Sequence, residues 1–234
     1  MTTPHDHIVT GFDEEQRRLT AEIVRMGEMA AAQLEAALDV VERRDDRTAA
    51  RVVANDDAIA ALEQEVSQDV VRLALRGPLA RDLRVILAAL RIAAAVERIG
   101  DYAANIAKRS AALALAPPLP QAGALRALGT DAAALTRAAI AAYRDADVDA
   151  ARRVREADAR IDAAYSTLYR ELVEAIEHDP RIATSATHLM FMAKNIERIG
   201  DHATNVAENV MYLVSGEDQL PPREKRDDSP SLAP

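Results

Sequence analysis

Residues 96–106 read VERIGDYAANI and residues 196–206 read IERIGDHATNV, identical at seven of eleven positions. The pentapeptide Glu-Arg-Ile-Gly-Asp therefore occurs twice, with an offset of 100 residues. A second match precedes it with an offset of 102: Asp45, Arg51, Val52, Asp56 and Ile59 recur as Asp147, Arg153, Val154, Asp158 and Ile161. A repeat of this length is too long for a solenoid unit. It indicates two tandem, pseudo-symmetric copies of one small domain.

The composition indicates an all-α protein. Aromatic residues make up only 3% of the 234 residues. A core that is rich in Ala suits closely packed helices, because Ala has the best helix propensity and lets helix axes approach. We expect six long helices, forming two three-helix bundles. Their expected ranges, from cap, Gly and Pro signals, are 14–44, 46–76, 78–114, 123–144, 148–178 and 180–215.

Pro and Gly residues also suggest the domain limits. The run Ala116-Pro117-Pro118-Leu119-Pro120 cannot remain helical. We therefore expect a flexible N-terminus over residues 1–12, a first bundle over 13–115, a Pro-rich linker over 116–122, a second bundle over 123–215 and a disordered tail over 216–234.

Charge and cysteine content narrow the function classes. The formal net charge is −9, which argues against a nucleic-acid partner, whose binding needs a basic face. The chain has no cysteine, which excludes disulfides and thiolate sites. The first residues lack the pattern of a signal peptide, and no apolar run approaches the roughly 20 residues that span a bilayer. We expect a cytoplasmic protein.

Apolar residues form a seam along two of the expected helices. The spacing alternates between three and four residues, as in a helix that packs on one side. The first seam contains Ala89, Ile92, Val96, Ile99, Ala103 and Ile106. The second contains Leu189, Met192, Ile196, Ile199, Ala203, Val206, Val210 and Leu213. Gly100 and Gly200 interrupt these helices, and we expect them to mark the close approach of another helix.

An acidic row accompanies each seam. Glu97, Asp101 and Asn105 are four residues apart, so they share a helix face, and their copies are Glu197, Asp201 and Asn205. The helical wheel places both rows away from the seam, facing outward. A solvated polar face is the simplest explanation, because charged residues are usually exposed.

Further carboxylates favour a metal site instead. Asp158 and Asp162 are four apart, whereas in the first half Asp56 is followed by Ala60. Carboxylates at this spacing repel one another, and a shared hard cation neutralises the repulsion. An all-oxygen ligand set favours Mg, Ca, Mn or oxidised iron over zinc or copper. No Glu-x-x-His occurs, so a ferritin-like di-iron site is not supported.

No enzyme motif accompanies these residues. The chain has no Gly-rich phosphate loop, dinucleotide fingerprint or nucleophile elbow. Nothing in the sequence pairs a general base with a nucleophile. We expect a non-enzymatic protein.

The chain resembles the PhoU family over roughly residues 7–215. The resemblance is carried by the duplicated ERIGD-x-x-x-N helices, the Asp-x-x-x-Asp at 158–162 and the six-helix layout. Met26-Gly27, the Asp82-Leu83-Arg84 triplet and the His7-Ile8…Phe12 start add to it. The resemblance implies two similar three-helix bundles that often dimerise.

This resemblance also implies a function. PhoU-like proteins regulate the phosphate-specific ABC transporter and repress the phosphate-starvation response, bridging the transporter's ATPase subunit and a membrane sensor histidine kinase. Some members hold multinuclear metal clusters on surface E(D)-x-x-x-D motifs. The matching candidates here are Glu97, Asp101, Glu197, Asp201, Asp158, Asp162 and Asp56. Iron, manganese, magnesium and zinc all remain open.

An alternative function is metal or phosphate buffering, with clustered cations holding phosphate between carboxylates. The net negative charge disfavours it, because it offers no general basic pocket for an anion.

Overall fold

Six long helices, three in each half of the chain, build the structure. The structure, a computed structural model, describes residues 4–76, 80–113 and 116–216. Its elements in chain order are α1 (Pro4–Arg43), α2 (Asp46–Ala74), α3 (Ala80–Leu113), α4 (Ala122–Asp145), α5 (Val148–His178), the 3-10 turn η1 (Pro180–Ile182) and α6 (Ala183–Ser215). The predicted all-α class and the two three-helix bundles are confirmed.

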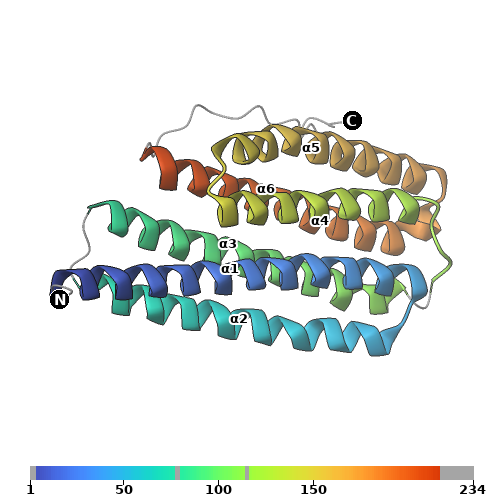
Figure 1. Cartoon of the computed structure of the whole chain (residues 1–234). Coiled ribbons are helices and arrows are strands. Elements are labelled where there is room, and N and C mark those ends of the chain that lie inside the picture. Colours follow the sequence, from blue (N-terminus) through green and yellow to red (C-terminus); the bar gives the residue numbers. More distant parts are fainter. Residues whose placement is uncertain (1–3, 77–79, 114–115, 217–234) are drawn as a thin grey trace.

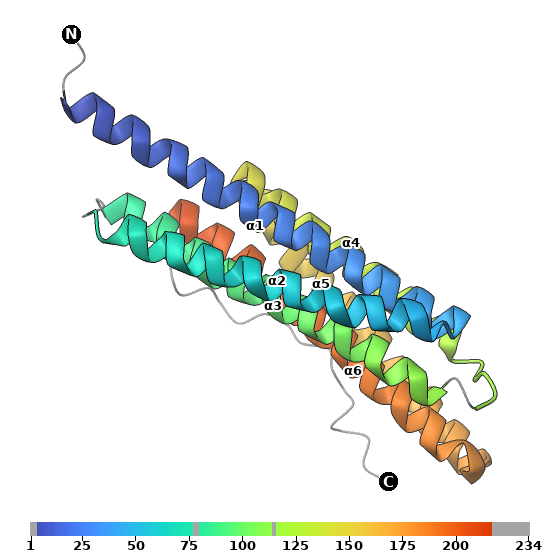
Figure 2. The ribbon, with the colours of Figure 1, turned by 90° about the horizontal axis from the view of Figure 1, so that it is seen from below.

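The two bundles pack along their length. Helices α1, α3, α6 and α4 form a closed ring in which each contacts the next. Helix α2 packs on α1 and α3 at one side, and α5 packs on α4 and α6 at the other. Figures 1 and 2 show the resulting elongated shape, with α2 and α5 as its outer helices.

Local cap signals start and end several helices as predicted. The Asp45 carboxylate accepts hydrogen bonds from the backbone N–H groups of Arg47 and Thr48 at the start of α2. Asp147 accepts one from the Ala150 N–H at the start of α5. These bonds satisfy amides that have no partner within the helix. At the end of α6, Gly216 takes the left-handed conformation (φ 77°) that glycine adopts easily.

Two helix starts differ from the predictions. Helix α1 begins at Pro4, before the predicted start at Glu14. Proline costs nothing in a first turn, and helix propagation adds one hydrogen bond per residue once a nucleus exists. The Asp179–Pro180 signal starts the 3-10 turn η1, and α6 follows at Ala183. The predicted start at Pro78 and the tail over 217–234 lie outside the described residues.

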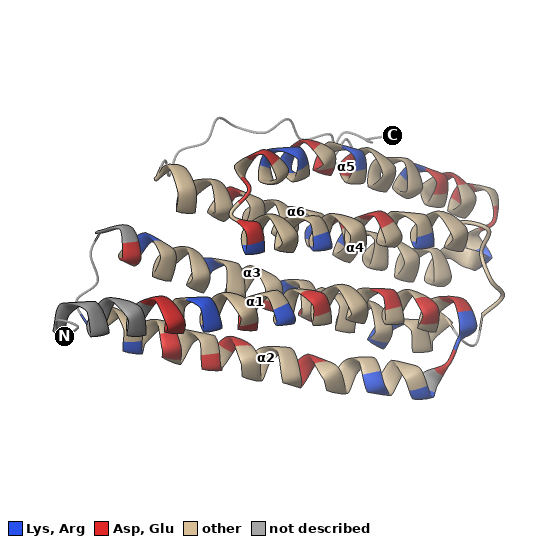
Figure 3. Cartoon of the chain, in the orientation of Figure 1, with Lys and Arg blue, Asp and Glu red and all other residues tan. Residues whose placement is uncertain are grey.

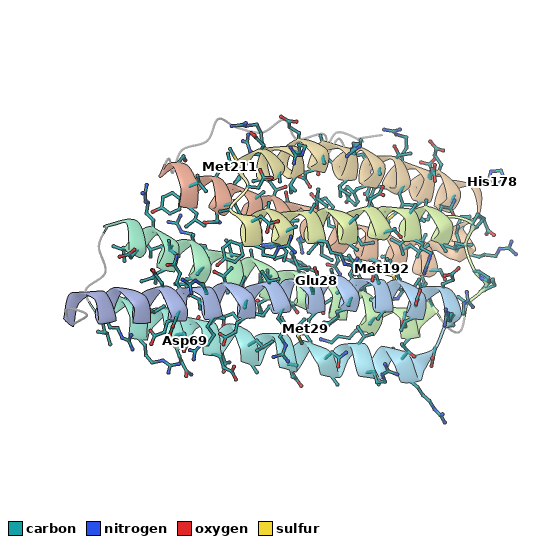
Figure 4. The ribbon with its side chains drawn as sticks, in the orientation of Figure 1. Glu28, Met29, Asp69, His178, Met192 and Met211 are labelled. Atoms are coloured by element: carbon teal, nitrogen blue, oxygen red, sulfur yellow. The ribbon has the colours of Figure 1, made fainter. Side chains whose placement is uncertain are left out.

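The predicted seams form the core. All six residues of the α3 seam are fully buried, and those of the α6 seam from Leu189 to Val210 are at most 2% exposed. Leu213 is partly buried and packs against the same core. Met192 lies among these packed side chains (Figure 4). Because α3 and α6 contact each other, the two halves share one hydrophobic core.

A pseudo-twofold relation connects the halves. Gly27 of α1 lies against Ile140 of α4, and Gly129 of α4 lies against Leu38 of α1. Gly129 and Ile140 are the copies of Gly27 and Leu38 at the offset of 102, so the two contacts are the same contact made twice. On the opposite side, the rings of the equivalent residues Tyr102 and His202 lie 5.6 Å apart.

No helix within the described ranges combines the length and hydropathy needed to cross a membrane.

Candidate functional site

Each acidic row lies on a helix that packs against a neighbouring helix carrying further carboxylates. We define the first-half cluster as Asp56 of α2 with Glu97 and Asp101 of α3. The second-half cluster is its copy with one addition, and it contains Asp158 and Asp162 of α5 with Glu197 and Asp201 of α6. The pairs α2–α3 and α5–α6 pack closely. Carboxylates from two helices therefore approach one another in each half.

Glycines make room for these carboxylates. A Cβ atom on Gly200 would lie 2.6 Å from Asp158 Oδ1 and 3.2 Å from Ile161. A Cβ atom on Gly100 would lie 3.0 Å from Ile59 and 3.4 Å from Asp56 Oδ1. The expectation that both glycines mark the approach of another helix is confirmed, and the second contact is the tighter one.

Hydrogen bonds and an ion pair hold the first-half cluster. Gln33 Nε2 on α1 donates to Asp56 Oδ1 (3.2 Å) and to the Gly100 carbonyl (3.0 Å). Asp101 pairs with Arg98 (2.9 Å) and accepts from Asn105 Nδ2 (3.3 Å). Gln33 thereby joins all three helices of the bundle at the glycine.

Two carboxylates of this cluster, Asp56 and Glu97, lie in surroundings that disfavour their charged forms. Burial raises the pKa of Asp56, and the charge of Asp101 raises it further, while the hydrogen bond from Gln33 opposes both. Burial also raises the pKa of Glu97; Arg98 opposes this, and Asp101, Asp56 and Glu63 add to it. Mutual repulsion of this kind is what a bound cation relieves.

The second-half cluster is more deeply buried. Asp158 and Asp162 are each 1% exposed and Glu197 is 3% exposed. The prediction of an outward-facing row is wrong for Glu197. A helical wheel considers a single helix. It could not show that α5 packs over the side of α6 that carries Glu197. Lys194 Nζ lies 2.9 Å from Glu197 Oε1 and 4.8 Å from the centre of the Tyr165 ring, so a lysine offsets part of the buried charge.

The two clusters differ in composition at equivalent positions. Lys194 corresponds to Ala94, so the first half has no lysine there. Tyr165 corresponds to Glu63, whose charge raises the pKa of Glu97. Sequence reasoning missed Glu63, although it follows Asp56 by seven residues and so shares its helix face. Glu63 adds a carboxylate to a cluster in which Ala60 supplies none.

Metal ligands are not preassembled in either cluster. Within the described residues, no three His, Cys, Asp or Glu side chains converge as they would around a metal ion. His178 ends α5 at one end of the molecule (Figure 4). The donor chemistry of the first-half cluster fits a hard cation, provided that the carboxylates rotate toward it.

Other charged residues are distributed over the molecule. Figure 3 shows acidic and basic residues interspersed along the helices in this view. One buried carboxylate outside the clusters, Asp69 of α2, pairs with Arg18 of α1 (2.5 Å) and with Arg72 of its own helix. Figure 4 places it between α1 and α2. This pairing explains Asp69 as a structural residue.

Comparison with known proteins gives one consistent result. A model described as the PhoU domain matches residues 23–110 and again residues 125–210, one match in each half. A phosphate-specific transport system accessory protein PhoU homolog of Xylella fastidiosa (strain 9a5c) is 60% identical over 231 residues, which cover 99% of this chain and 98% of the relative. A homolog of the same name from Caulobacter vibrioides is 39% identical over 95% of this chain and 97% of its own length.

Solved structures agree with these matches. The crystal structure of PhoU from Pseudomonas aeruginosa superposes with a TM-score of 0.85 at 32% identity, covering 88% of this chain and 100% of that one. The phosphate transport system regulatory protein PhoU from Streptococcus pneumoniae superposes with a TM-score of 0.83 at 23% identity, covering 89% of this chain and 99% of that one. The second likeness concerns the fold alone.

Proposed function

The chain belongs to the PhoU family, and from this premise we propose that it regulates phosphate uptake and represses the phosphate-starvation response when phosphate is plentiful. The observation that carries the proposal is the 60% identity, over nearly the full length of both chains, to a relative named as a phosphate-specific transport accessory protein. The two PhoU-domain matches, one in each half, support it.

The proposed mode of action is bridging, without catalysis. The partners are the ATPase subunit of the phosphate ABC transporter and the sensor histidine kinase of the phosphate response. The protein acts in the cytoplasm and reaches the membrane through these partners. An elongated molecule with α2 on one side and α5 on the other has two separate outer faces (Figure 1). Such a shape suits simultaneous contact with two proteins, and a second copy of this chain forming a homodimer adds further faces.

The bridging proposal is tested with purified components. The ATPase subunit is immobilised, this protein is bound to it, and the cytoplasmic part of the kinase is then added while interferometry records each step. We expect the kinase to bind only after this protein has been loaded. Kinase binding that is equal with and without this protein would contradict bridging, and failure of both steps would contradict the choice of partners.

A bound metal is a second part of the proposal. In the first half, Asp56, Glu97, Asp101 and the nearby Glu63 would hold a hard cation; in the second half, Asp158, Asp162, Glu197 and Asp201 would do so. The cation would supply positive charge that cancels the repulsion between carboxylates and ties neighbouring helices together. The raised pKa values of Asp56 and Glu97 support this, since burial and neighbouring carboxylates disfavour the charged forms that a cation would stabilise.

Calorimetry with Mn²⁺ tests the metal proposal. Chelator-treated wild type should bind Mn²⁺, and the double variant Asp101→Ala with Asp201→Ala should bind it at least about tenfold more weakly, since one charged ligand is lost per cluster. A variant of the exposed neighbour Asp57→Ala is the control. Equal affinities for all three proteins would refute the assignment. Unchanged phosphate regulation in the double variant would refute a role for metal in signalling.

Metal or phosphate buffering is the alternative function. The clustering of carboxylates in both halves is the observation that favours it. It requires that metal-loaded protein take up phosphate reversibly. A calorimetric titration of the Mn²⁺-loaded protein with phosphate that releases no heat would eliminate it.

A further inference from the structure

A basic cleft lies between α3 and α6 and borders the first-half cluster at Asp101. It has a volume of about 570 Å³. Six of its residues define it here: Arg98, Lys108 and Arg109 of α3 with His188, Phe191 and Arg198 of α6. A concentration of four Lys and Arg side chains is unexpected in a chain with a formal net charge of −9.

The charge of the cleft is only partly compensated. Asp101 also lines it, but this carboxylate pairs with Arg98 (2.9 Å). The charge of Lys108 lowers the pKa of Asp56 across the neighbouring helix, so this lysine is compensated in part. The Arg109 guanidinium lies 4.3 Å from the centre of the Phe191 ring, and the Arg198 guanidinium lies 5.7 Å from the centre of the Tyr102 ring. Aromatic rings therefore hold the guanidinium groups of Arg109 and Arg198, whose charge remains available to a ligand.

Phe191 adds an apolar contact point. It is 50% exposed, although the chain has only two phenylalanines. An exposed aromatic ring with a stacked arginine is the combination that is enriched at the centre of protein–protein interfaces. A site for a small anion alone needs no such ring.

The internal repeat shows that the cleft is specific to one end of the α3–α6 groove. The copies of Lys108 and Arg109 are Glu208 and Asn209, and the residues equivalent to His188 and Phe191 are Ala88 and Arg91. At the opposite end of the α3–α6 contact, the position equivalent to Lys108 is thus the acidic residue Glu208. Duplication of the fold alone does not account for the basic cleft.

We propose that the basic cleft docks a carboxylate-rich segment of a protein partner, with an apolar side chain of that segment seated on Phe191. From Arg98 to Arg109 the cleft runs along roughly 16 Å of helix, given the 1.5 Å rise per residue. This length matches about three turns of a helical segment. The charges are spread along it, which suits a row of carboxylates better than a single phosphate ion. The inference rests on the proposed function, since it names a surface by which such a regulator holds a partner.

Peptide binding to the purified full-length protein tests the proposal. The probe is a fluorescein-labelled, 14-residue helical peptide with Glu at i,i+4 spacing around one Phe, and the control peptide has Gln in place of Glu. Fluorescence anisotropy gives the dissociation constant. We expect the double variant Lys108→Glu with Arg109→Glu to weaken binding of the Glu peptide at least about tenfold, since like charges across an interface repel. Both side chains lie at the surface, and circular dichroism checks that the variant is folded.

A matched pair of exposed basic residues on other helices is the control. Arg51→Glu with Arg170→Glu changes the net charge by the same amount, and it should alter the affinity by less than about twofold. Equal weakening by both double variants would refute the cleft, because net charge alone would then account for binding. No binding by wild type at millimolar peptide, or equal affinity for the Gln peptide, would also overturn the proposal. So would complete displacement of the peptide by inorganic phosphate but not by sulfate, which would identify an anion site.

These outcomes are separable from failure of the proposed function. Peptide binding is measured on the isolated protein, whereas repression of the starvation response is measured in cells. Derepression in a deletion strain together with an absence of cleft-dependent binding would refute this inference and leave the proposed function intact.

Discussion

At the residue scale, the two glycines of the ERIGD copies stand in unequal surroundings. A Cβ atom on Gly200 would overlap Asp158 Oδ1 at 2.6 Å, whereas one on Gly100 would first meet the flexible end of Ile59 at 3.0 Å. Because Asp158 is fully buried, it has little room to move. The tandem copies thus provide an internal comparison of one substitution in two environments.

We predict that Gly200→Ala lowers the free energy of unfolding by about 1–3 kcal/mol, the usual cost of overpacking a core. Gly100→Ala should be closer to neutral, because the gain of about 1 kcal/mol in helix propensity offsets a milder contact. Urea unfolding of both variants measures the difference. A Gly100→Ala variant that is less stable than Gly200→Ala would contradict this account of the packing.

Asp56 provides a second prediction at this scale. Its carboxylate is partly desolvated and lies close enough to Asp101 to be repelled. In chelator-treated protein, Asp56→Asn should raise stability by roughly 0.5 kcal/mol, because the amide oxygen still accepts the hydrogen bond from Gln33 without carrying charge. Thermal unfolding measures the change, with Asp131→Asn, an exposed residue of α4, as the control.

The effect of Asp56→Asn should reverse with metal. Added Mn²⁺ should stabilise the wild type more than the variant, because the variant has lost a charged ligand. An equal shift in melting temperature for both proteins would mean that Asp56 does not bind the cation.

The carboxylates of the site could be predicted from sequence, but their compensating residues could not. Spacing of four residues placed Glu97 with Asp101 and Asp158 with Asp162. Gln33 lies 67 residues from the Gly100 carbonyl that it contacts, so only the packed bundle brings them together. The wheel position of Glu197 suggested exposure, since a wheel carries no information about a neighbouring helix such as α5.

At the element scale, the contact between α1 and α4 holds the two halves together through paired glycines. A Cβ atom on Gly27 would collide with Ile140, and one on Gly129 would lie 2.6 Å from Leu38. The helix ends, in contrast, follow from local signals such as Asp45, Asp147 and Gly216. Helix ends can therefore be predicted from sequence. Which helix packs against a given glycine depends on the assembled fold.

We predict that Gly27→Ala costs about 2–3 kcal/mol of unfolding free energy, because the new methyl group pushes α4 away from α1. Combining it with Ile140→Val, which removes a methylene from the collision, should recover part of the loss. Denaturant unfolding of the two single variants and the double variant gives the coupling energy. Strictly additive effects would show that Gly27 and Ile140 do not compete for space.

An ion pair across the same contact leads to a pH prediction. Arg137 of α4 donates two hydrogen bonds to Glu35 of α1 (2.6 and 2.8 Å), and these lower the pKa of Glu35 from its usual 4.5. The stabilisation is therefore present above pH 4.5 and is lost as the pH falls through the lowered pKa. Both side chains are substantially exposed, so the pair contributes about 0.5–1 kcal/mol.

The variant Glu35→Gln isolates this contribution. It should be less stable than wild type at pH 7, and the difference should shrink as the pH falls below 4.5 and through the lowered pKa of Glu35. Urea unfolding across this range measures the difference. A stability difference that does not change with pH would exclude the ion pair as its source.

At the scale of the whole molecule, duplication provides a symmetric frame and divergence of the copies makes its faces different. The halves share one core through α3 and α6. The acidic clusters differ in Glu63 and Lys194, and Lys108 and Arg109 of the basic cleft are Glu208 and Asn209 in the other copy. A regulator that must hold two different partners needs such unlike surfaces. The unlike surfaces therefore agree with a bridging role better than a strictly symmetric molecule would.

The most direct test of the central claim is alkaline phosphatase activity in a strain that lacks this protein and grows with abundant phosphate. The account predicts high activity that returns to the low wild-type level when the gene is restored. Activity that stays low without the protein would contradict its role as a repressor of the phosphate-starvation response.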